Sequence, residues 1–355
     1  MSRYAIDALR AFGEGALVAL GAADDEARIL TDCLIDAQLR TAAFHNQGLV
    51  RLAIYARRLR DGGLTPRAPI TVVRETAATA LLDGGNGLGQ VVAHRAMTMA
   101  TAKARAAGIG AVAARRSNHF GTASYFTLMA ARSGLVGLAC TNASPEMPAW
   151  GGATALVGTN PWSVAVPRPH GDPVVLDISN AVSGKGAIRH YAAAGRPLPA
   201  GWALDSSGRP VTDPHAAADA LLAPIGGYKG YGIALMIDLL TGGLAGGAVG
   251  TAVGSPYQFS RAQGVSHLTV ALDPEAFGGA AALGDAVRRL AEEVYSSPRQ
   301  PGVGALLLPG DPERLRAEES RGHGIDLPDD TVARLRALGA ETGVAFPEPI
   351  ACGSP

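Results

Sequence analysis

The stretch RRSNHFGTASYFTLMAARSGLVGLACTNASPEMPAWGGATALVGTNPWSVAVP, residues 115–167, is the one around which the fold is organised. An apolar run with the composition of a β-strand, residues 109–114, leads into it, and an amphipathic run, residues 124–133, lies within it. His119 lies between these two runs, where a strand changes into a helix. A histidine at such a position is suited to exchange a proton with a bound substrate, because its pKa is near neutrality.

The residues before His119 indicate a helix start. Ser117 or Asn118 is a candidate N-cap, and the positive end of the helix dipole would then disfavour a charged imidazole. A half-buried histidine at a capped helix start, without any catalytic role, explains the same local pattern equally well. The local sequence leaves both interpretations open.

The distribution of amide and amine side chains favours the functional interpretation. All six asparagines lie in turns that contain Gly, His or Pro, at positions 46, 86, 118, 142, 160 and 180. Only 3 of the 31 basic residues are lysines, which leaves 31 − 3 = 28 arginines. Two of the lysines, Lys185 and Lys229, lie in the glycine turns SGKG and GGYKGYG. The first of these turns is suited to offer backbone amides and an ammonium group to a pyrophosphate.

Composition excludes several classes of protein. The 355 residues carry no formal net charge and no basic stripe, which argues against nucleic acid as a partner. The first fifteen residues lack the pattern of a signal peptide, and the apolar run 231–250 contains Asp238 and several glycines, so we expect a buried helix and no membrane partner. The three cysteines form neither a CxxC pair nor a metal signature. We therefore expect a cytoplasmic protein without a metal site.

The pattern along the chain alternates between strands and helices. Residues 1–61 predict helices, with Asp24 as an N-cap, and residues 69–83 predict two short strands. The glycine turn GGNGLG then opens a long helix, but it lacks the third glycine of GxGxxG and no acidic residue ends a strand about twenty residues later, so we reject a Rossmann fold. Further strands are predicted at 134–141, 163–167, 174–178 and 267–274, a turn at 205–208, and helices at 284–295, after 312 and at 329–339.

Arg51 is the candidate for binding a substrate carboxylate. Its guanidinium is able to form two parallel hydrogen bonds, and no Asp or Glu lies nearer along the chain than Asp36 and Asp61. The alternative is a solvated helix arginine among Arg57, Arg58 and Arg60.

Eight motifs in register carry a resemblance that covers nearly the whole chain. They are GNGLGQVVAHRAM, SNHFGTASYF, TNASPEMPAWGG, LVGTNPWSVAVP, GWALDSSGRPVTDP, PIGGYKGYGIALMIDLLTGGLAGG, HLTVALDPEAF and PGDPERLRAEESRGHGI. In these motifs the chain resembles the malate/L-lactate dehydrogenase family of the second, non-Rossmann type. That family also includes ureidoglycolate dehydrogenase, sulfolactate dehydrogenase, diketogulonate reductase and piperideine-2-carboxylate reductase.

The resemblance implies an α/β fold with a mixed, largely antiparallel central sheet flanked by helices. It implies a helical substrate and dimerisation domain of residues 1–75 with 305–355, and a central cofactor-binding domain of residues 76–304. It also implies a cofactor, NAD or NADP, a small carboxylate substrate, and a homodimer with the active site near the subunit interface. The catalytic histidine of the family falls on His119 and its carboxylate-binding arginine on Arg51. The cofactor-contacting positions fall on Asn142, Ala143, Ser144, Thr159, Asn160, Asp177, Ile178, Ser179, Asn180, Lys185, Tyr228, Lys229, Gly230, Gly310 and Asp311.

One loop departs from the family pattern. The family has D-S-H-G before the arginine, whereas this chain has His45, Asn46, Gln47 and Gly48. Either His45 still reaches the site, or the pair Asn46 and Gln47 replaces the serine and histidine with amides, which bind a substrate but do not titrate. This makes a substrate other than plain lactate or malate more credible.

Three functions remain open from the sequence. The first is hydride transfer between nicotinamide and C2 of a 2-oxo or 2-hydroxy acid, with His119 as general acid and base. The second is reduction of a cyclic imine carboxylate by the same hydride. The third is an inactive homologue that serves as a binding protein, which the altered loop suggests and the intact His119 argues against.

Overall fold

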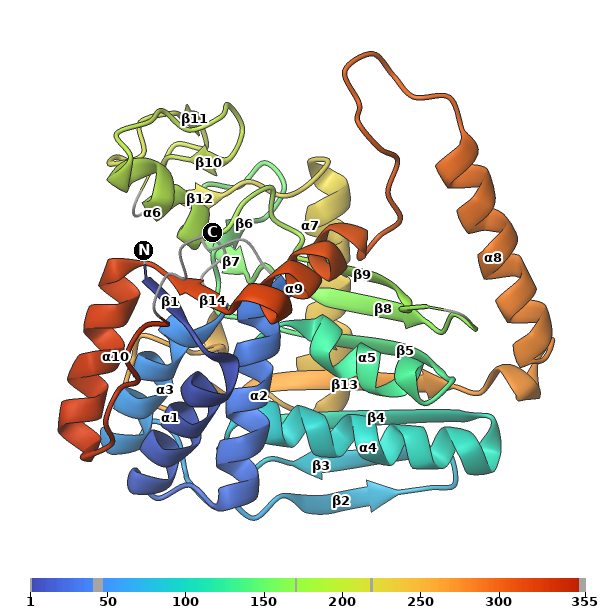
Figure 1. Cartoon of the computed structure of the whole chain (residues 1–355), viewed down its shortest axis with the longest axis horizontal. Helices are drawn as coiled ribbons and strands as arrows, with labels where there is room; N and C mark the ends of the chain where they lie inside the picture. Colours follow the sequence, from blue (N-terminus) through green and yellow to red (C-terminus); the bar gives the residue numbers. More distant parts are fainter. Residues whose placement is uncertain (1, 41–46, 170, 218–219, 351–355) are drawn as a thin grey trace.

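The computed structural model describes residues 2–40, 47–169, 171–217 and 220–350. A seven-stranded sheet runs through the middle of the molecule, in the order β2-β3-β4-β13-β5-β8-β9 (Figure 1). Its strands are β2 (Thr71–Glu75), β3 (Thr79–Asp83), β4 (Ile109–Ser117), β13 (Val265–Leu272), β5 (Val136–Thr141), β8 (Trp162–Val166) and β9 (Val174–Ile178).

Only β3 and β4 pair in parallel, and the other neighbouring strands of this sheet pair antiparallel. The prediction of a mixed, largely antiparallel sheet is therefore confirmed. A doubly wound Rossmann sheet is mostly parallel, so the rejection of that fold is also correct.

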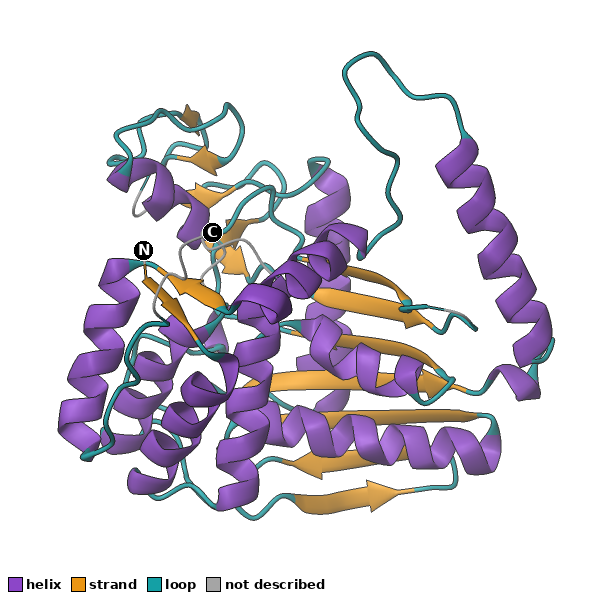
Figure 2. Ribbon diagram, viewed as in Figure 1, coloured by secondary structure: helices purple, strands orange, loops and turns teal. Residues whose placement is uncertain are grey.

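Helices cover both faces of the sheet. α4 (Gly89–Ala107) and α5 (Ala123–Arg132) pack on one face, and α7 (Tyr228–Asp238) with the π-helical turn η3 (Leu239–Gly243) lies behind the other (Figure 2). The stripe Ala93, Ala96 and Ala100 of α4 is fully buried. Small residues at helical spacing let α4 approach the strands closely, which explains the apolar sequence run after the GGNGLG turn.

A helical layer lies beside the strand ends on one side of the sheet (Figure 1). It contains α1 (Ile6–Ala19), α2 (Asp24–Arg40), the 3₁₀ turn η2 (Leu49–Arg51), α3 (Leu52–Arg60), α9 (Asp311–His323) and α10 (Asp329–Thr342), with the strand pair β1 (Ser2–Tyr4) and β14 (Ile325–Leu327). These elements share one hydrophobic core that joins both ends of the described chain. The proposed division into two domains stays a prediction, and β2 already belongs to the central sheet before residue 76.

A small lobe stands above the sheet in Figure 1. It holds α6 (Lys185–Ala193) and the three-stranded sheet of β10 (Ala203–Leu204), β11 (Pro210–Val211) and β12 (Leu221–Leu222). The short strands β6 (Met147–Pro148) and β7 (Ala155–Val157) pair beneath it. The predicted turn at 205–208 is confirmed by a hydrogen bond from the Gly208 amide to the Asp205 carbonyl.

The prediction of a buried helix over 231–250 is only partly correct. One side of α7, η3 and the residue that follows η3 is exposed, and its large apolar residues include Ile233, Met236, Leu239, Leu240 and Leu244. α8 (Ala280–Ser296) and the segment after it also stand away from the body as an arm (Figure 1). Within the part of the chain that the structure describes, no helix is long and apolar enough to cross a membrane. The short 3₁₀ turns η4 (Gly250–Ala252) and η5 (Pro274–Ala276) complete the elements.

Candidate active site

Most of the predicted site segments meet at one end of the central sheet. β4, β5 and β9 end there, while β8 and β13 begin there, because these strands alternate in direction. The register makes this explicit, since Ser117 pairs with Val265, Thr141 with His267, and Trp162 with Ile178. The loops that carry His119, Asn142, Asn160 and Asn180 therefore leave the sheet side by side.

His119 follows β4 directly and is half-buried. Its backbone amide donates to the side-chain oxygen of Gln263 (3.0 Å), which fixes the main chain at this point. The first residue of α4, Gly89, packs against the carbonyl groups of Asn118 and His119, where any Cβ would overlap them. The requirement for glycine in GLGQ thus follows from the position of His119.

The ring of His119 has a buried polar partner that the sequence did not single out. Its Nδ1 lies 2.6 Å from the hydroxyl of Tyr55, on α3. That hydroxyl accepts a hydrogen bond from Nε2 of Gln90 (2.8 Å), on the first turn of α4. Two helices thus hold the imidazole in one orientation, with Nε2 as its remaining nitrogen.

The pKa of His119 is lowered from its ordinary value to about 3. Burial is the main cause, and the positive charge of Arg51, the ring of His267 and the charge of Arg58 act in the same direction. The resting imidazole is therefore neutral at physiological pH.

The expected helix cap is wrong. α5 begins at Ala123 with Thr122 as its N-cap, so neither Ser117 nor Asn118 caps it. The Ser117 hydroxyl lies 2.7 Å from Nε2 of His267, and Asn118 donates to the carbonyl of Gly87 (2.9 Å). The low basicity of His119 thus comes from burial and neighbouring charges and not from a helix dipole.

Arg51 ends η2 and is the N-cap of α3, one helical turn before Tyr55. It is half-buried, and its charge adds to the lowering of the pKa of His119 and opposes the rise that burial gives the pKa of Tyr55. His45 and Asn46 lie outside the described residues. Gln47 is described, and its Oε1 is buried without a hydrogen-bond partner within the described part of the chain.

Glu146 lies within electrostatic range of Lys185 and Arg51, and the sequence analysis did not single it out. It lies just before β6, with its amide donating to Val157 (3.1 Å) and its carbonyl accepting from Leu222 (2.8 Å). Burial raises the pKa of its carboxyl group, while Lys185 and Arg51 oppose this rise. The argument that Arg51 lacks a nearby carboxylate considered only distance along the chain, and the fold brings Glu146 to it.

Three predicted asparagines have side chains that hold loops together. Asn142 donates to Asp238 (2.9 Å) and to the Ala248 carbonyl (2.9 Å), and it accepts from the Ser266 amide (2.8 Å). Asn160 accepts from the amide of Ala143 (2.9 Å) and donates to Ala234 (2.8 Å).

Asn180 joins the next pair of loops in the same way. It donates to the carbonyls of Thr159 (3.2 Å) and Asn160 (2.6 Å). All three asparagine side chains are fully or almost fully buried. Any contact between these three residues and a cofactor would therefore involve the backbone of their turns.

The remaining predicted cofactor turns lie around these asparagines. Asp177 accepts from the amide of Ser124 (2.8 Å) at the start of α5, and burial raises its pKa. The Ser179 hydroxyl donates to Ala181 (3.3 Å). The other members, Ala143, Ser144, Thr159 and Ile178, are partly accessible in the same loops.

Two helix starts offer positive groups to an anion. Lys185 opens α6, and its ammonium group donates to the Ala220 carbonyl. The hydroxyl of Ser183, two residues earlier, is buried without a partner in the described chain. A buried donor without a partner beside a helix start and an ammonium group fits the pyrophosphate of a dinucleotide.

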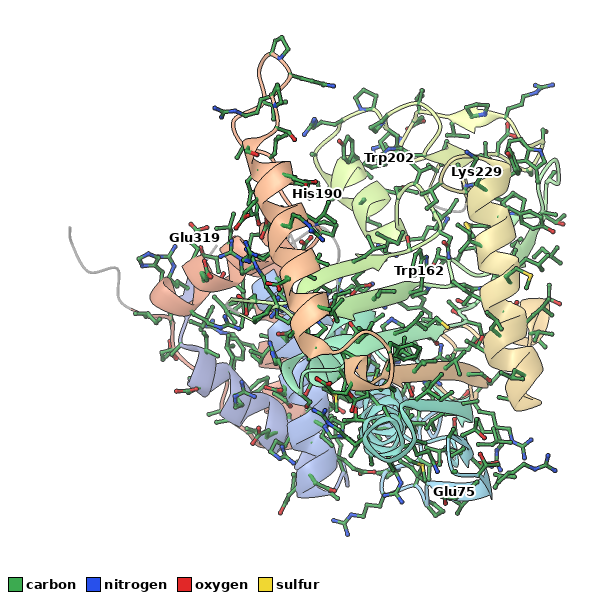
Figure 3. All side chains as sticks on the ribbon, turned by 90° about the vertical axis from the view of Figure 1, so that its right-hand side faces the viewer. Glu75, Trp162, His190, Trp202, Lys229 and Glu319 are labelled. Carbon is green, nitrogen blue, oxygen red and sulfur yellow. The ribbon has the colours of Figure 1, made fainter. Side chains whose placement is uncertain are left out.

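The second helix start is that of α7. Tyr228 and Lys229 are exposed there and Gly230 is buried, with Lys229 at the same end of the molecule as His190 and Trp202 (Figure 3). Gly310 and Asp311 lie apart, at the start of α9, where Asp311 accepts from the Tyr295 hydroxyl (2.8 Å) and the Leu308 amide (2.8 Å). The structure thus gives Asp311 a role in forming its own turn.

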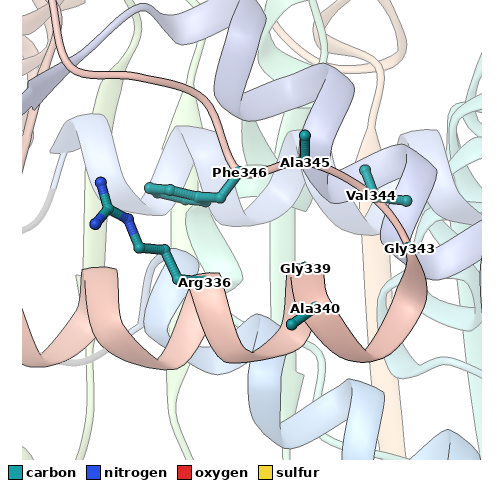
Figure 4. A pocket seen from close by; sticks show the side chains of 7 residues that line it. All are labelled: Arg336, Gly339, Ala340, Gly343, Val344, Ala345 and Phe346. Atoms are coloured by element: carbon teal, nitrogen blue, oxygen red, sulfur yellow. The ribbon is translucent and has the colours of Figure 1, made fainter.

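Two other features do not belong to this site. Among the described residues, no group of three or more His, Cys, Asp or Glu side chains is arranged to hold a metal ion. A shallow hollow between α10 and the segment after it is lined by Arg336, Gly339, Ala340, Gly343, Val344, Ala345 and Phe346 (Figure 4). None of the predicted site residues lines this hollow.

Comparison with known families gives a match over nearly the whole chain. The model of the malate/L-lactate dehydrogenase family matches residues 4–336. The chain is 38% identical over 325 residues to (2R)-3-sulfolactate dehydrogenase (NADP(+)) of Chromohalobacter salexigens, which covers 91% of this chain and 93% of the relative. Relatives whose names specify NAD(+) and relatives whose names specify NADP(+) both match.

Solved structures give the same result for the fold. Sulfolactate dehydrogenase from Methanocaldococcus jannaschii superimposes with a TM-score of 0.91 and 32% identity, covering 98% of both chains. The delta1-piperideine-2-carboxylate reductase from Pseudomonas syringae superimposes with a TM-score of 0.83 and 28% identity, covering 95% of this chain and 100% of the other.

Proposed function

The chain belongs to the malate/L-lactate dehydrogenase family of NAD(P)-dependent oxidoreductases, and we propose that it interconverts a 2-oxo acid and a 2-hydroxy acid with His119 as proton donor and acceptor. The observation that carries this proposal is the half-buried ring of His119, held through Nδ1 by Tyr55, with Arg51 in electrostatic reach. A fixed imidazole beside a guanidinium provides a proton and an anchor for a carboxylate in one place.

We assign substrate binding, proton transfer and cofactor binding to different residues. Arg51 binds the substrate carboxylate and orients C2, and His119 gives a proton to the oxygen on C2 or removes it in the reverse direction. When bound, the nicotinamide supplies or accepts the hydride. Ser183, Lys185 and the backbone of the asparagine-linked turns hold the phosphate end of that cofactor.

The test is a panel of 2-oxo acids with NADH and NADPH, followed by nicotinamide absorbance. We expect turnover with one of these cofactors and loss of roughly a hundredfold or more in the His119→Ala variant, with nearly unchanged cofactor affinity. Cofactor binding is measured by protein fluorescence, which also separates an inactive binding protein from an enzyme. Unchanged turnover in His119→Ala would remove the histidine from the mechanism.

Reduction of a cyclic imine carboxylate is the second candidate. It is favoured by Gln47, which replaces a histidine of the family pattern and carries a buried acceptor without a partner in the described chain. An acceptor that does not titrate suits the N–H group of a protonated imine. Turnover of an authentic cyclic imine above that of every 2-oxo acid, with or without added ammonia, would select this candidate.

We also propose a cytoplasmic homodimer. The apolar side of α7 and η3, defined by Ile233, Met236, Leu239, Leu240 and Leu244, is exposed in the single chain and suited to pack against a second copy. The two described cysteines, Cys33 and Cys140, are buried free thiols, as is usual in a reducing compartment. Light scattering should give twice the chain mass, and Leu239→Glu with Leu244→Glu should give a monomer.

A further inference from the structure

Gln90, the hydrogen-bond partner of Tyr55, is unusual because only one end of its buried amide group is hydrogen-bonded. Its side chain is fully buried, its Nε2 donates to the Tyr55 hydroxyl, and its Oε1 has no partner within the described chain. A buried amide oxygen without a partner costs free energy, so its retention here calls for an explanation.

The direction of the hydrogen bonds fixes the tautomer of His119. A phenol has one proton to donate, and here its oxygen accepts from Gln90. Among the described residues, Nδ1 of His119, 2.6 Å away, is the hydrogen-bond partner left for this proton, so we assign Tyr55 as the donor. A neutral ring in this arrangement carries its proton on Nε2, which suits recognition of the oxygen of a 2-oxo acid. Before Nε2 gives this proton up, Nδ1 takes a second proton from water, so that donation from the imidazolium leaves a neutral ring with its proton on Nδ1.

Oxidation of a 2-hydroxy acid needs the opposite direction of the hydrogen bond between Tyr55 and His119. The C2–H bond then breaks with its electron pair leaving as hydride to the oxidised nicotinamide, and the O–H proton passes to Nε2 of His119. Nε2 must be unprotonated before this step, with its lone pair free to accept the proton. The proton of the neutral ring therefore lies on Nδ1 and is donated to the Tyr55 oxygen. The imidazolium later loses a proton to water, which completes the balance of the reaction.

The Tyr55 proton then needs another acceptor. A half-turn of the Gln90 amide exchanges its nitrogen and oxygen with little change in shape and presents Oε1 to the phenol. The other groups facing His119 and Tyr55 are Arg51, Arg58, His267 and Cys33. The arginines are donors only, and both nitrogens of His267 are already bonded, to Thr141 and Ser117.

We propose that Gln90 is a positioning residue whose amide turns over to reverse the hydrogen bonds through Tyr55, so that His119 alternates between its two tautomers. This inference rests on the proposed function of His119. Gln90 acts through Tyr55 and does not itself touch the substrate.

The first measurement is independent of any substrate. Nitrogen-15 NMR of the histidine-labelled protein reports the protonation of each ring nitrogen, and His119→Asn assigns the signal. We expect an unprotonated Nδ1 in the wild type and a signal moved toward protonated Nδ1 in Gln90→Glu, at a pH where the introduced carboxylate is ionised. Gln90→Met, which removes both donor and acceptor, should give a mixture of tautomers.

The second measurement is the pH profile of kcat/KM in both directions. An acceptor in place of the amide favours the imidazolium, so Gln90→Glu should move the apparent pKa for oxidation upward by about one unit or more. Gln90→Met should lower kcat in both directions by about tenfold without changing KM for the cofactor. Thr127→Val, which removes another buried hydrogen bond away from His119, is the control and should leave the profile in place.

The outcomes separate the two proposals. If the NMR signal and the pH profile are unchanged in both Gln90 variants while His119→Ala is inactive, only the proposed role of Gln90 is overturned. Full activity of His119→Ala would overturn the assignment of His119, whatever the Gln90 variants do.

Discussion

Acid should destabilise the protein through His267, which is fully buried in β13. Its Nδ1 lies 2.8 Å from the Thr141 hydroxyl and its Nε2 2.7 Å from that of Ser117, and the ring stacks on Phe120 at 4.8 Å. Burial lowers its pKa to about 3. Because the folded pKa lies below the unfolded value of about 6.5, this contribution to stability is complete above pH 6.5 and is lost as the pH falls toward 3.

The magnitude follows from these two values. Between pH 7 and pH 5 the unfolded histidine gains a proton that the folded one excludes, which costs about 2 kcal/mol of unfolding free energy. We expect His267→Gln to be less stable than the wild type at pH 7, because it loses the ring stacking and leaves a buried hydroxyl unpaired. Between pH 7 and pH 5, however, the variant should lose about 2 kcal/mol less unfolding free energy than the wild type.

Urea unfolding at both pH values, at one protein concentration, measures this difference. His323→Gln, at an exposed position at the end of α9, is the matched control and should leave the pH dependence as it is. An equal loss of stability in the wild type and His267→Gln would refute the assignment of a neutral buried ring.

Three further predictions concern the site. Arg51→Ala should raise KM for the acid strongly or abolish activity, because loss of a buried ion pair costs about 2–5 kcal/mol; an unchanged KM in steady-state kinetics would exclude it as the carboxylate anchor. Asn46→Ser combined with Gln47→His should shift preference toward plain 2-hydroxy acids, and an unchanged substrate ranking would mean that this loop does not set specificity. Gly89→Ala should lower kcat by about tenfold or more, since its methyl group would displace the backbone that carries His119, and normal kcat in a stable variant would contradict the close approach.

Local patterns in the sequence were sufficient for most of the fold. The strands around β4, β5 and β9 have apolar runs of the right length, bounded by turns, and the glycine turn before α4 starts a helix with a clear apolar stripe. The exposed side of α7 was not foreseen, because an apolar helix has the same sequence whether it packs inside one chain or against another.

Only part of the site could be predicted from the sequence. His119 could be found from its place after a strand, but Tyr55 lies 64 residues from it and Gln90 lies 35 residues from Tyr55. The turn composition marked Asn142 and Asn160 correctly as special, yet it could not tell a ligand contact from a hydrogen bond that joins two loops. Such distinctions depend on which segments meet at the end of the sheet.

The guanidinium of Arg58 is nearly fully buried and donates to five oxygen atoms, of Gly63, Asn118, Pro256, Gln258 and Arg261. Four of these are main-chain carbonyls, and three lie in the irregular segment before Gln263, which in turn holds the amide of His119. Opening this segment on its own would leave a buried charge without its hydrogen-bond partners, at a cost of about 3–5 kcal/mol. Segments without regular structure usually exchange their amide hydrogens early, but this one should exchange as slowly as a central strand, in the same cooperative unit.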